Sequence, residues 1–151
     1  MKKLFYSLLL FAAFSLITSC ATIIGGAKYN AHVKVPDHPS AKITYNGTYQ
    51  GEGNATFKIK RREANKFSVS VKEESCDEQT FNFTQRSFRG WAFFGTLVGW
   101  TGLYSGILLP WGVAVDLATG ALWKPNITEK GVTKFDMKNY NYILEYKGCK
   151  K

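Results

Sequence analysis

The stretch from residue 31 to residue 84 alternates between apolar and polar side chains in short runs. Residues 56–60 and 67–71 place an apolar side chain at every second position, which is the period that separates the two faces of a β-strand. Asn46-Gly47 follows a similar run and is typical of a tight hairpin turn, because both residues tolerate a positive φ. The other runs that we expect to form strands are 32–35, 41–45, a return strand from Tyr49, and 81–83. Short strands between polar turns predict a small antiparallel β-sandwich, not a parallel α/β sheet.

Part of this region resembles the repeat of the PEGA family. The motif reads Pro39-Ser40-Ala41-Lys42-Ile43-Thr44-Tyr45-Asn46-Gly47 and is followed by Gly51. The resemblance extends from Val33 to about Phe83 and departs from the family at Gly53-Asn54, where Thr-Pro is usual. It implies a non-catalytic β-sandwich of an envelope protein, with a poorly defined ligand such as surface polysaccharide.

The pattern changes completely in the next segment, residues 85–125. No charged residue occurs between Arg89 and Asp116, and the segment contains all the tryptophans of the chain, which are Trp91, Trp100, Trp111 and Trp123. Its glycines, Gly95, Gly99, Gly102 and Gly106, are spaced so that they share one face of an α-helix. Such spacing lets a second backbone approach closely, as in small-xxx-small helix pairs. The segment resembles the glycine-zipper regions of some outer-membrane lipoproteins.

The length of this apolar segment predicts two helices. Residues 91–109 are about as long as one membrane-spanning helix, and Pro110 then ends or kinks it. A second, shorter helix is expected over 111–123, with Arg86, Arg89 and Lys124 flanking the pair, where they could reach lipid head groups. We expect a helical hairpin that is associated with a membrane. The alternative is a helical hairpin that covers the β-sheet with its tryptophans in the core.

Two further strands are expected at 133–137 and 140–146, in the C-terminal segment 126–151. The predicted fold class is therefore α+β: a small antiparallel, PEGA-like β-sandwich over 31–84, with the Gly/Trp-rich hairpin inserted before C-terminal strands. These strands would return to the sheet and carry Cys149 toward Cys76.

The first residues of the chain have the order of a secretory signal. Lys2 and Lys3 form a positive start, an apolar run extends from Leu4 to Ile17, and small hydroxylated residues follow. The apolar run is about 14 residues, short of the roughly 20 that a spanning helix needs. This segment could belong to a lipoprotein signal. The alternatives are an uncleaved N-terminal anchor and an ordinary secretory signal that precedes a cysteine by chance.

Leu16-Ile17-Thr18-Ser19-Cys20 resembles the lipobox of bacterial lipoproteins. The resemblance implies cleavage of residues 1–19, a thioether-linked diacylglycerol on Cys20, and usually an acyl chain on its new amino group. Residues 20–30 would then be a lipidated, flexible tether. Because Ala21 follows the cysteine, where Asp is the familiar retention signal for the inner membrane, the resemblance favours the periplasmic face of an outer membrane.

The formal net charge of +9 includes only two lysines from the signal, so the exported chain remains basic. Export makes nucleic acid a poor partner. Anionic lipid, lipopolysaccharide and envelope polysaccharide are better candidates, because a basic surface near a membrane is attracted by its negative potential. The alternative is that the lysines only keep the domain soluble.

Cysteine usage allows one disulfide. With Cys20 assigned to lipid, Cys76 and Cys149 remain, and an exported chain permits them either to pair or to stay free.

The sequence lacks the patterns of common catalytic sites, and we expect no enzyme activity, metal or cofactor. His32 and His38 have no metal-ligand spacing with the cysteines, and Ser105 lacks the glycines of a nucleophile elbow. The acidic residues Glu73, Glu74, Asp77 and Glu78 are more typical of a solvated turn than of a glycosidase pair.

Three functional hypotheses follow. The first is a membrane-anchored envelope lipoprotein with a non-catalytic binding or structural role. The second is a membrane-active homo-oligomer that assembles through the zipper glycines. The third is a phage or mobile-element lipoprotein that modifies the host envelope.

Overall fold

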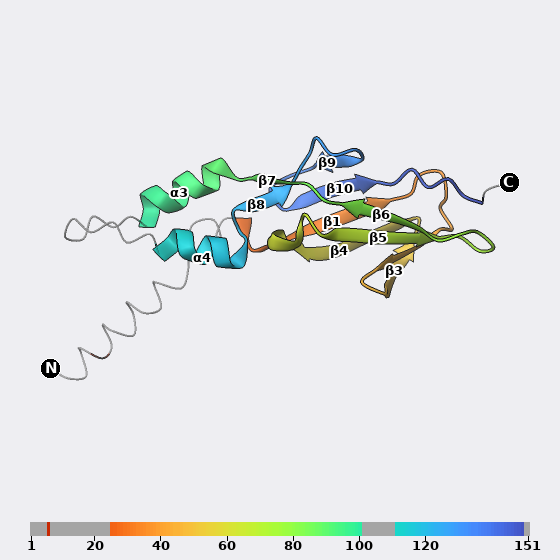
Figure 1. The fold of residues 1–151 in the computed structure, drawn as a ribbon, viewed down its shortest axis with the longest axis horizontal. Helices are drawn as coiled ribbons and strands as arrows, with labels where there is room; N and C mark the ends of the chain where they lie inside the picture. Colours follow the sequence, from red (N-terminus) through yellow and green to blue (C-terminus); the bar gives the residue numbers. More distant parts are fainter. Residues whose placement is uncertain (1–5, 7–24, 101–110, 150–151) are drawn as a thin grey trace.

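The computed structural model describes Tyr6 and residues 25–100 and 111–149. Its strands are β1 (Lys28–Lys34), β2 (Lys42–Tyr45), β3 (Thr48–Glu52), β4 (Asn54–Lys60), β5 (Phe67–Lys72), β6 (Gln79–Phe83), β7 (Arg86–Phe88), β8 (Trp123–Pro125), β9 (Val132–Lys134) and β10 (Asn139–Ile143). Its helices are the short 3-10 turn η1 (Arg61–Glu63), α3 (Gly90–Trp100) and α4 (Trp111–Thr119). The chain is thus a β-rich α+β protein (Figure 1).

Two four-stranded sheets form the body of the molecule. One has the strand order β4-β1-β10-β9, and the other has the order β3-β2-β5-β6. All neighbouring strands in the second sheet are antiparallel. The turn between β2 and β3 has φ of 49° at Asn46 and 73° at Gly47, which is the hairpin geometry expected for this pair.

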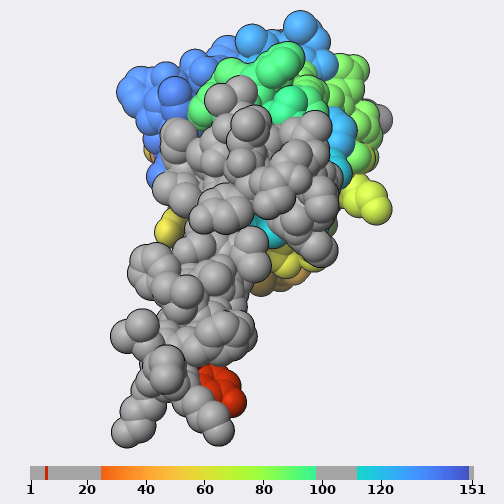
Figure 2. Space-filling view, turned by 90° about the vertical axis from the view of Figure 1, so that its left-hand side faces the viewer, coloured from red at the N-terminus to blue at the C-terminus, as the bar shows by residue number. Residues whose placement is uncertain are grey.

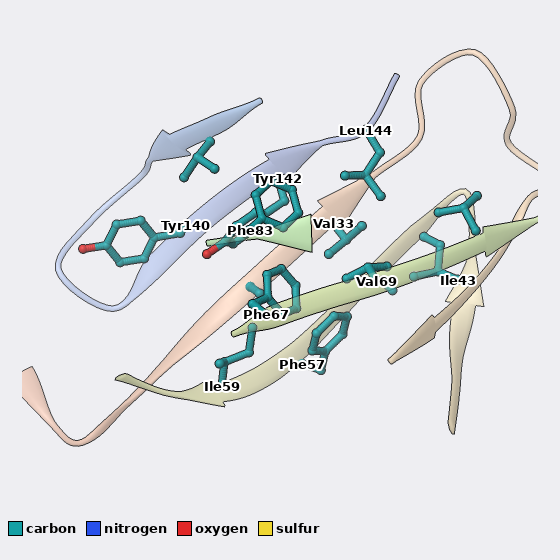
Figure 3. Packing of buried hydrophobic residues seen from close by; sticks show 14 of the residues in the cluster. Val33, Ile43, Phe57, Ile59, Phe67, Val69, Phe83, Tyr140, Tyr142 and Leu144 are labelled. Carbon is teal, nitrogen blue, oxygen red and sulfur yellow. The ribbon is translucent and has the colours of Figure 1, made fainter. Parts of the chain in front are cut away.

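The apolar positions of both sheets face a common core. The alternation in β4 and β5 puts every second side chain inside, so that Phe57 and Ile59 are buried beneath Phe67 and Val69 (Figure 3). Phe67 connects the two layers, because its ring centroid lies 4.8 Å from that of Tyr142 in the opposite sheet. The two sheets therefore stabilise each other as a face-to-face sandwich.

One strand pair differs from the antiparallel arrangement that we expected. β1 pairs with β10 in parallel, with Ala31 opposite Tyr140 and Val33 opposite Tyr142. Both strands start at the end of the sandwich where the helices lie (Figure 1). β9 runs back toward that end, and the β9–β10 turn there reverses the chain, so that β10 runs in the same direction as β1. Of the two C-terminal strands, β10 is thus an inner strand of its sheet and β9 is the edge strand beside it.

Several strand boundaries also differ from expectation, and β10 ends at Ile143 where we expected 146. β1 begins at Lys28, inside the expected tether, because the Tyr29 side chain is buried and packs edge-on against Tyr140. β9 ends at Lys134, where the expectation was 137. The reason is local: the Asp136 carboxylate accepts hydrogen bonds from the backbone N–H groups of Lys138 and Asn139, which stabilises a turn.

The helices form an antiparallel pair at one end of the sandwich (Figure 1). The pair stands on a two-stranded ladder in which β7 pairs with β8. Trp123, expected in the second helix, lies instead in β8, because α4 ends at Thr119 and Gly120 turns the chain with φ of 75°. A Cβ at Gly120 would lie within 2.5 Å of the Arg62 Cβ, so glycine is required at this turn.

Candidate functional site

The base of the helical pair is held by a fully buried arginine, Arg61. Its guanidinium donates hydrogen bonds to the carbonyl oxygens of Met137 at 2.7 Å, Gly26 at 3.0 Å, Gly25 at 3.2 Å and Trp123 at 3.4 Å. These carbonyls belong to the segment before β1, to β8 and to the β9–β10 turn. Backbone oxygens solvate this buried charge in place of water, and the three segments are thereby fixed to one another.

A second buried arginine, Arg89, lies beside the first and is only 3% exposed. Its Nη1 donates to the Ala121 carbonyl at 2.6 Å, and the guanidinium lies 4.9 Å from the ring centre of Trp91. A Cβ at Gly25 would overlap this guanidinium, so the segment before β1 packs directly against Arg89. We refer to Gly25, Gly26, Arg61 and Arg89 as the arginine junction.

Burial and the nearby Arg61 charge lower the pKa of Arg89 to about 10, which still leaves it cationic at neutral pH. The expected role of Arg89 at lipid head groups is therefore wrong, because the side chain is turned inward. Arg86 is exposed and stacks over the Trp123 ring at 4.0 Å. Lys124 is half-buried in β8.

Among the described residues, the buried apolar cluster at the helical pair is small. The cluster consists of Ala92, Ala121 and Leu122, with Phe93 packed against it. A polar contact joins the two helices instead: the Thr96 hydroxyl donates to the buried Asp116 carboxylate at 2.5 Å.

Large apolar side chains face outward from the same pair. Phe94 is 64% exposed, Leu117 53% and Trp91 48%, and α3 lies at the surface in the view onto this end (Figure 2). We refer to these three residues as the apolar tip. In the described part of the chain, no helix is both long enough and apolar enough to cross a membrane.

The structure places some of the predicted zipper residues. Gly95 and Gly99 lie one turn apart in α3, and Gly95 is exposed, with nothing within 4 Å of where its Cβ would stand. Trp100 ends α3 and Trp111 begins α4. Gly102 and Gly106, together with Cys20 and the expected signal apart from Tyr6, lie outside the described residues.

The opposite end of the sandwich is closed covalently. Cys76 and Cys149 form a disulfide with their Cα atoms 4.6 Å apart, although 73 positions separate them in the sequence. The bond joins the loop after β5 to the segment after β10.

Polar contacts accompany the disulfide. The Glu73 carboxylate accepts hydrogen bonds from Ser40 at 2.6 Å and from His38 at 2.8 Å, and the ring of His38 packs edge-on against Tyr146. The hydrogen bond from Ser40, with a further contribution from His38, holds the pKa of Glu73 below its usual value. Within 25–100 and 111–149, no group of three or more His, Cys, Asp or Glu side chains could hold a metal ion.

Arg61 was not among the residues expected at a site. In the sequence it is one of two adjacent arginines after a strand, and only its parity with Phe57 and Ile59 indicates that its side chain points inward. Comparison with family models, curated proteins and solved structures finds no match to this chain.

Proposed function

We propose that the chain is a lipid-anchored envelope lipoprotein, held through acylated Cys20 at the periplasmic face of an outer membrane. Its role there is non-catalytic and consists of binding or bracing an envelope component. The observation that carries the proposal is that Gly25, five residues after Cys20 in the sequence, and the apolar tip share one end of the molecule, with Arg61 and Arg89 between them.

Chain length supports this arrangement. Cys20 precedes Gly25 by five residues, so a fully extended backbone separates the two by at most about 17 Å. Gly25 in turn is hydrogen-bonded to Arg61 and packed against Arg89. Acyl chains on Cys20 would therefore hold the apolar tip close to the bilayer surface, where exposed Trp and Phe side chains favour the interface.

The PEGA-like character of the sandwich is part of the same proposal. It depends on the motif from Pro39 to Gly51, which forms β2, the Asn46-Gly47 turn and most of β3. The parallel pair β1–β10 adds to this module a strand from beyond the motif.

Fractionation of cells that express the full chain tests the anchor and the tip separately. Cys20→Ala, behind an ordinary cleavable signal, should shift much of the protein from the membrane to the soluble fraction, and a carbonate wash should leave a remainder bound. Adding Trp91→Ser and Phe94→Ser should release that remainder, because both side chains are exposed and apolar.

The matched control for the tip variants replaces two exposed apolar side chains of the sandwich. Tyr49→Ser and Ile143→Ser, which are 56% and 43% exposed, should leave the membrane-bound remainder unchanged. Complete release of Cys20→Ala by carbonate, with the tip intact, would contradict the role of the tip. Unchanged membrane retention of every variant would contradict the role of Cys20.

A second candidate function is an oligomer assembled through α3. The exposed position of Gly95, one turn from Gly99, favours it, since open glycines let another helix approach. Crosslinking the purified lipoprotein in detergent should then give oligomers that Gly95→Leu abolishes. A strict monomer would remove this candidate.

A further inference from the structure

A groove of about 470 Å³ lies beside the segment that leads into β1. It is lined by residues 25–30, which include Lys28, and by Lys58 and Lys138. Strand pairing brings these lysines together: Asn30 of β1 lies opposite Lys58 of β4 on one side and opposite Asn139 of β10, the residue after Lys138, on the other.

The three lysines are exposed, and none of them forms an ion pair with a described residue. The acids on adjoining segments are already engaged. Asp136 accepts hydrogen bonds from Lys138 N and from Asn139, and Glu63 pairs with Lys60 at 3.5 Å. Neutral donors leave the charge of Asp136 in place, so three cationic lysines stand near one carboxylate. The groove therefore keeps a net positive charge and is suited to an anion.

Apolar side chains stand next to this charge. Phe135 and Met137 lie in the same β9–β10 turn as Lys138 and are 76% and 50% exposed. The Met137 carbonyl is bound to Arg61, so the turn is fixed to the same junction as Gly25. Lysines beside exposed apolar side chains match the boundary of a bilayer, with its phosphates and its acyl region, better than they match a free anion.

We infer that the Lys28–Lys58–Lys138 groove binds the phosphates of anionic lipid head groups in the membrane that carries the acyl chains. The inference rests on the proposed function, because attachment at Cys20 is what holds the groove at that surface. Flexible ammonium groups suit several mobile phosphates, whereas a planar guanidinium fork would select one fixed geometry. Binding would orient the end of the β4-β1-β10 sheet at which β1 begins toward the lipid head groups.

Lysine footprinting of the intact lipoprotein tests this inference. The protein is reconstituted in nanodiscs of phosphatidylcholine, alone or mixed with phosphatidylglycerol, and acetylation of each lysine is followed by mass spectrometry. Lys28, Lys58 and Lys138 should react about fivefold more slowly in the anionic nanodiscs, and high salt should remove the difference. The control lysines Lys34, Lys72 and Lys147, which are exposed and form no ion pair with a described residue, should react equally in both.

Matched variants provide a second readout. In the Cys20→Ala chain, Lys28→Gln, Lys58→Gln and Lys138→Gln together should weaken binding to phosphatidylglycerol vesicles about a hundredfold. The same three-charge loss at Lys34, Lys72 and Lys147 should have little effect.

Equal reactivity of the groove lysines in both kinds of nanodisc would overturn the inference. Equal protection by inorganic phosphate in neutral nanodiscs would also overturn it, because the site would then take a free anion. Failure of the proposed function looks different: the chain would carry no acyl mass at Cys20 and would not enter nanodiscs at all.

Discussion

The β-sandwich and the helical pair differ in how many of their apolar side chains are buried. The sandwich interlocks its aromatic rings, so that Phe67 contacts Phe57, Phe83 and Tyr142 across both layers. In the part of the helical end that the structure describes, the buried apolar cluster consists of Ala92, Ala121 and Leu122, whereas Phe94 and Trp91 are exposed. Since apolar burial is the main stabilising contribution to folding, the sandwich stabilises itself, whereas the helical pair depends on its base and on whatever covers its tip.

The largest contrast should appear when a phenylalanine is removed from each region. Phe67→Ala should lower the free energy of unfolding by about 4 kcal/mol, because it empties a core position that is 1% exposed. Phe94→Ala should change it by less than about 0.5 kcal/mol. Urea unfolding of the Cys20→Ala chain measures both. Similar losses from the two variants would mean that the tip is packed in solution, against this comparison.

The disulfide should rank next. Replacing Cys76 and Cys149 together by Ala should lower the free energy of unfolding by about 3 kcal/mol, because the unfolded chain is released from a loop that spans 73 positions. Urea unfolding of the double variant, with the Cys20→Ala chain as reference, gives the value. No change in stability would indicate that this end is held without the bond.

Arg61 should have a smaller but specific effect. Arg61→Ala removes four hydrogen bonds to carbonyls, and the relief of a buried charge offsets part of that loss, so the free energy of unfolding should fall by about 2 kcal/mol. Amide exchange should rise at Gly26 and in the β9–β10 turn. The neighbouring Arg62→Ala, at an exposed position, is the control and should change neither. Exchange that rises equally in both variants would contradict the junction.

The smallest effect is expected from pH at the disulfide end. Because the folded pKa of Glu73 lies below its unfolded value of about 4.5, the carboxylate stabilises the fold above that pH and loses this contribution as pH falls through the folded pKa. Glu73→Gln should therefore flatten the acid side of the stability profile. Glu74→Gln, with a carboxylate that is 90% exposed, should leave the profile unchanged. A profile that both variants alter equally would remove Glu73 from this role.

Local patterns predicted most of the sandwich because its strands are amphipathic. The alternation in 56–60 and 67–71 appears as β4 and β5, and Asn46-Gly47 forms the expected turn. The parallel pairing of β10 with β1 could not be predicted in this way, because alternation determines which face is buried and does not determine strand direction.

The candidate site was less predictable than the fold. The apolar run and the glycine spacing indicated a helical pair, and the cysteine count left Cys76 and Cys149 as partners. Arg61 and Arg89 were missed as structural residues, since a buried arginine is rare and its partners are backbone oxygens that carry no sequence signal. Only the three-dimensional arrangement brings Gly25, Trp123 and Met137 to one guanidinium.

Intact mass measurement of the protein extracted from membranes tests the proposed anchor most directly. The account predicts a chain that begins at Cys20 and carries the added mass of a diacylglycerol and an amide-linked acyl chain. A processed chain recovered from the aqueous fraction, with the sulfur of Cys20 unmodified, would contradict it.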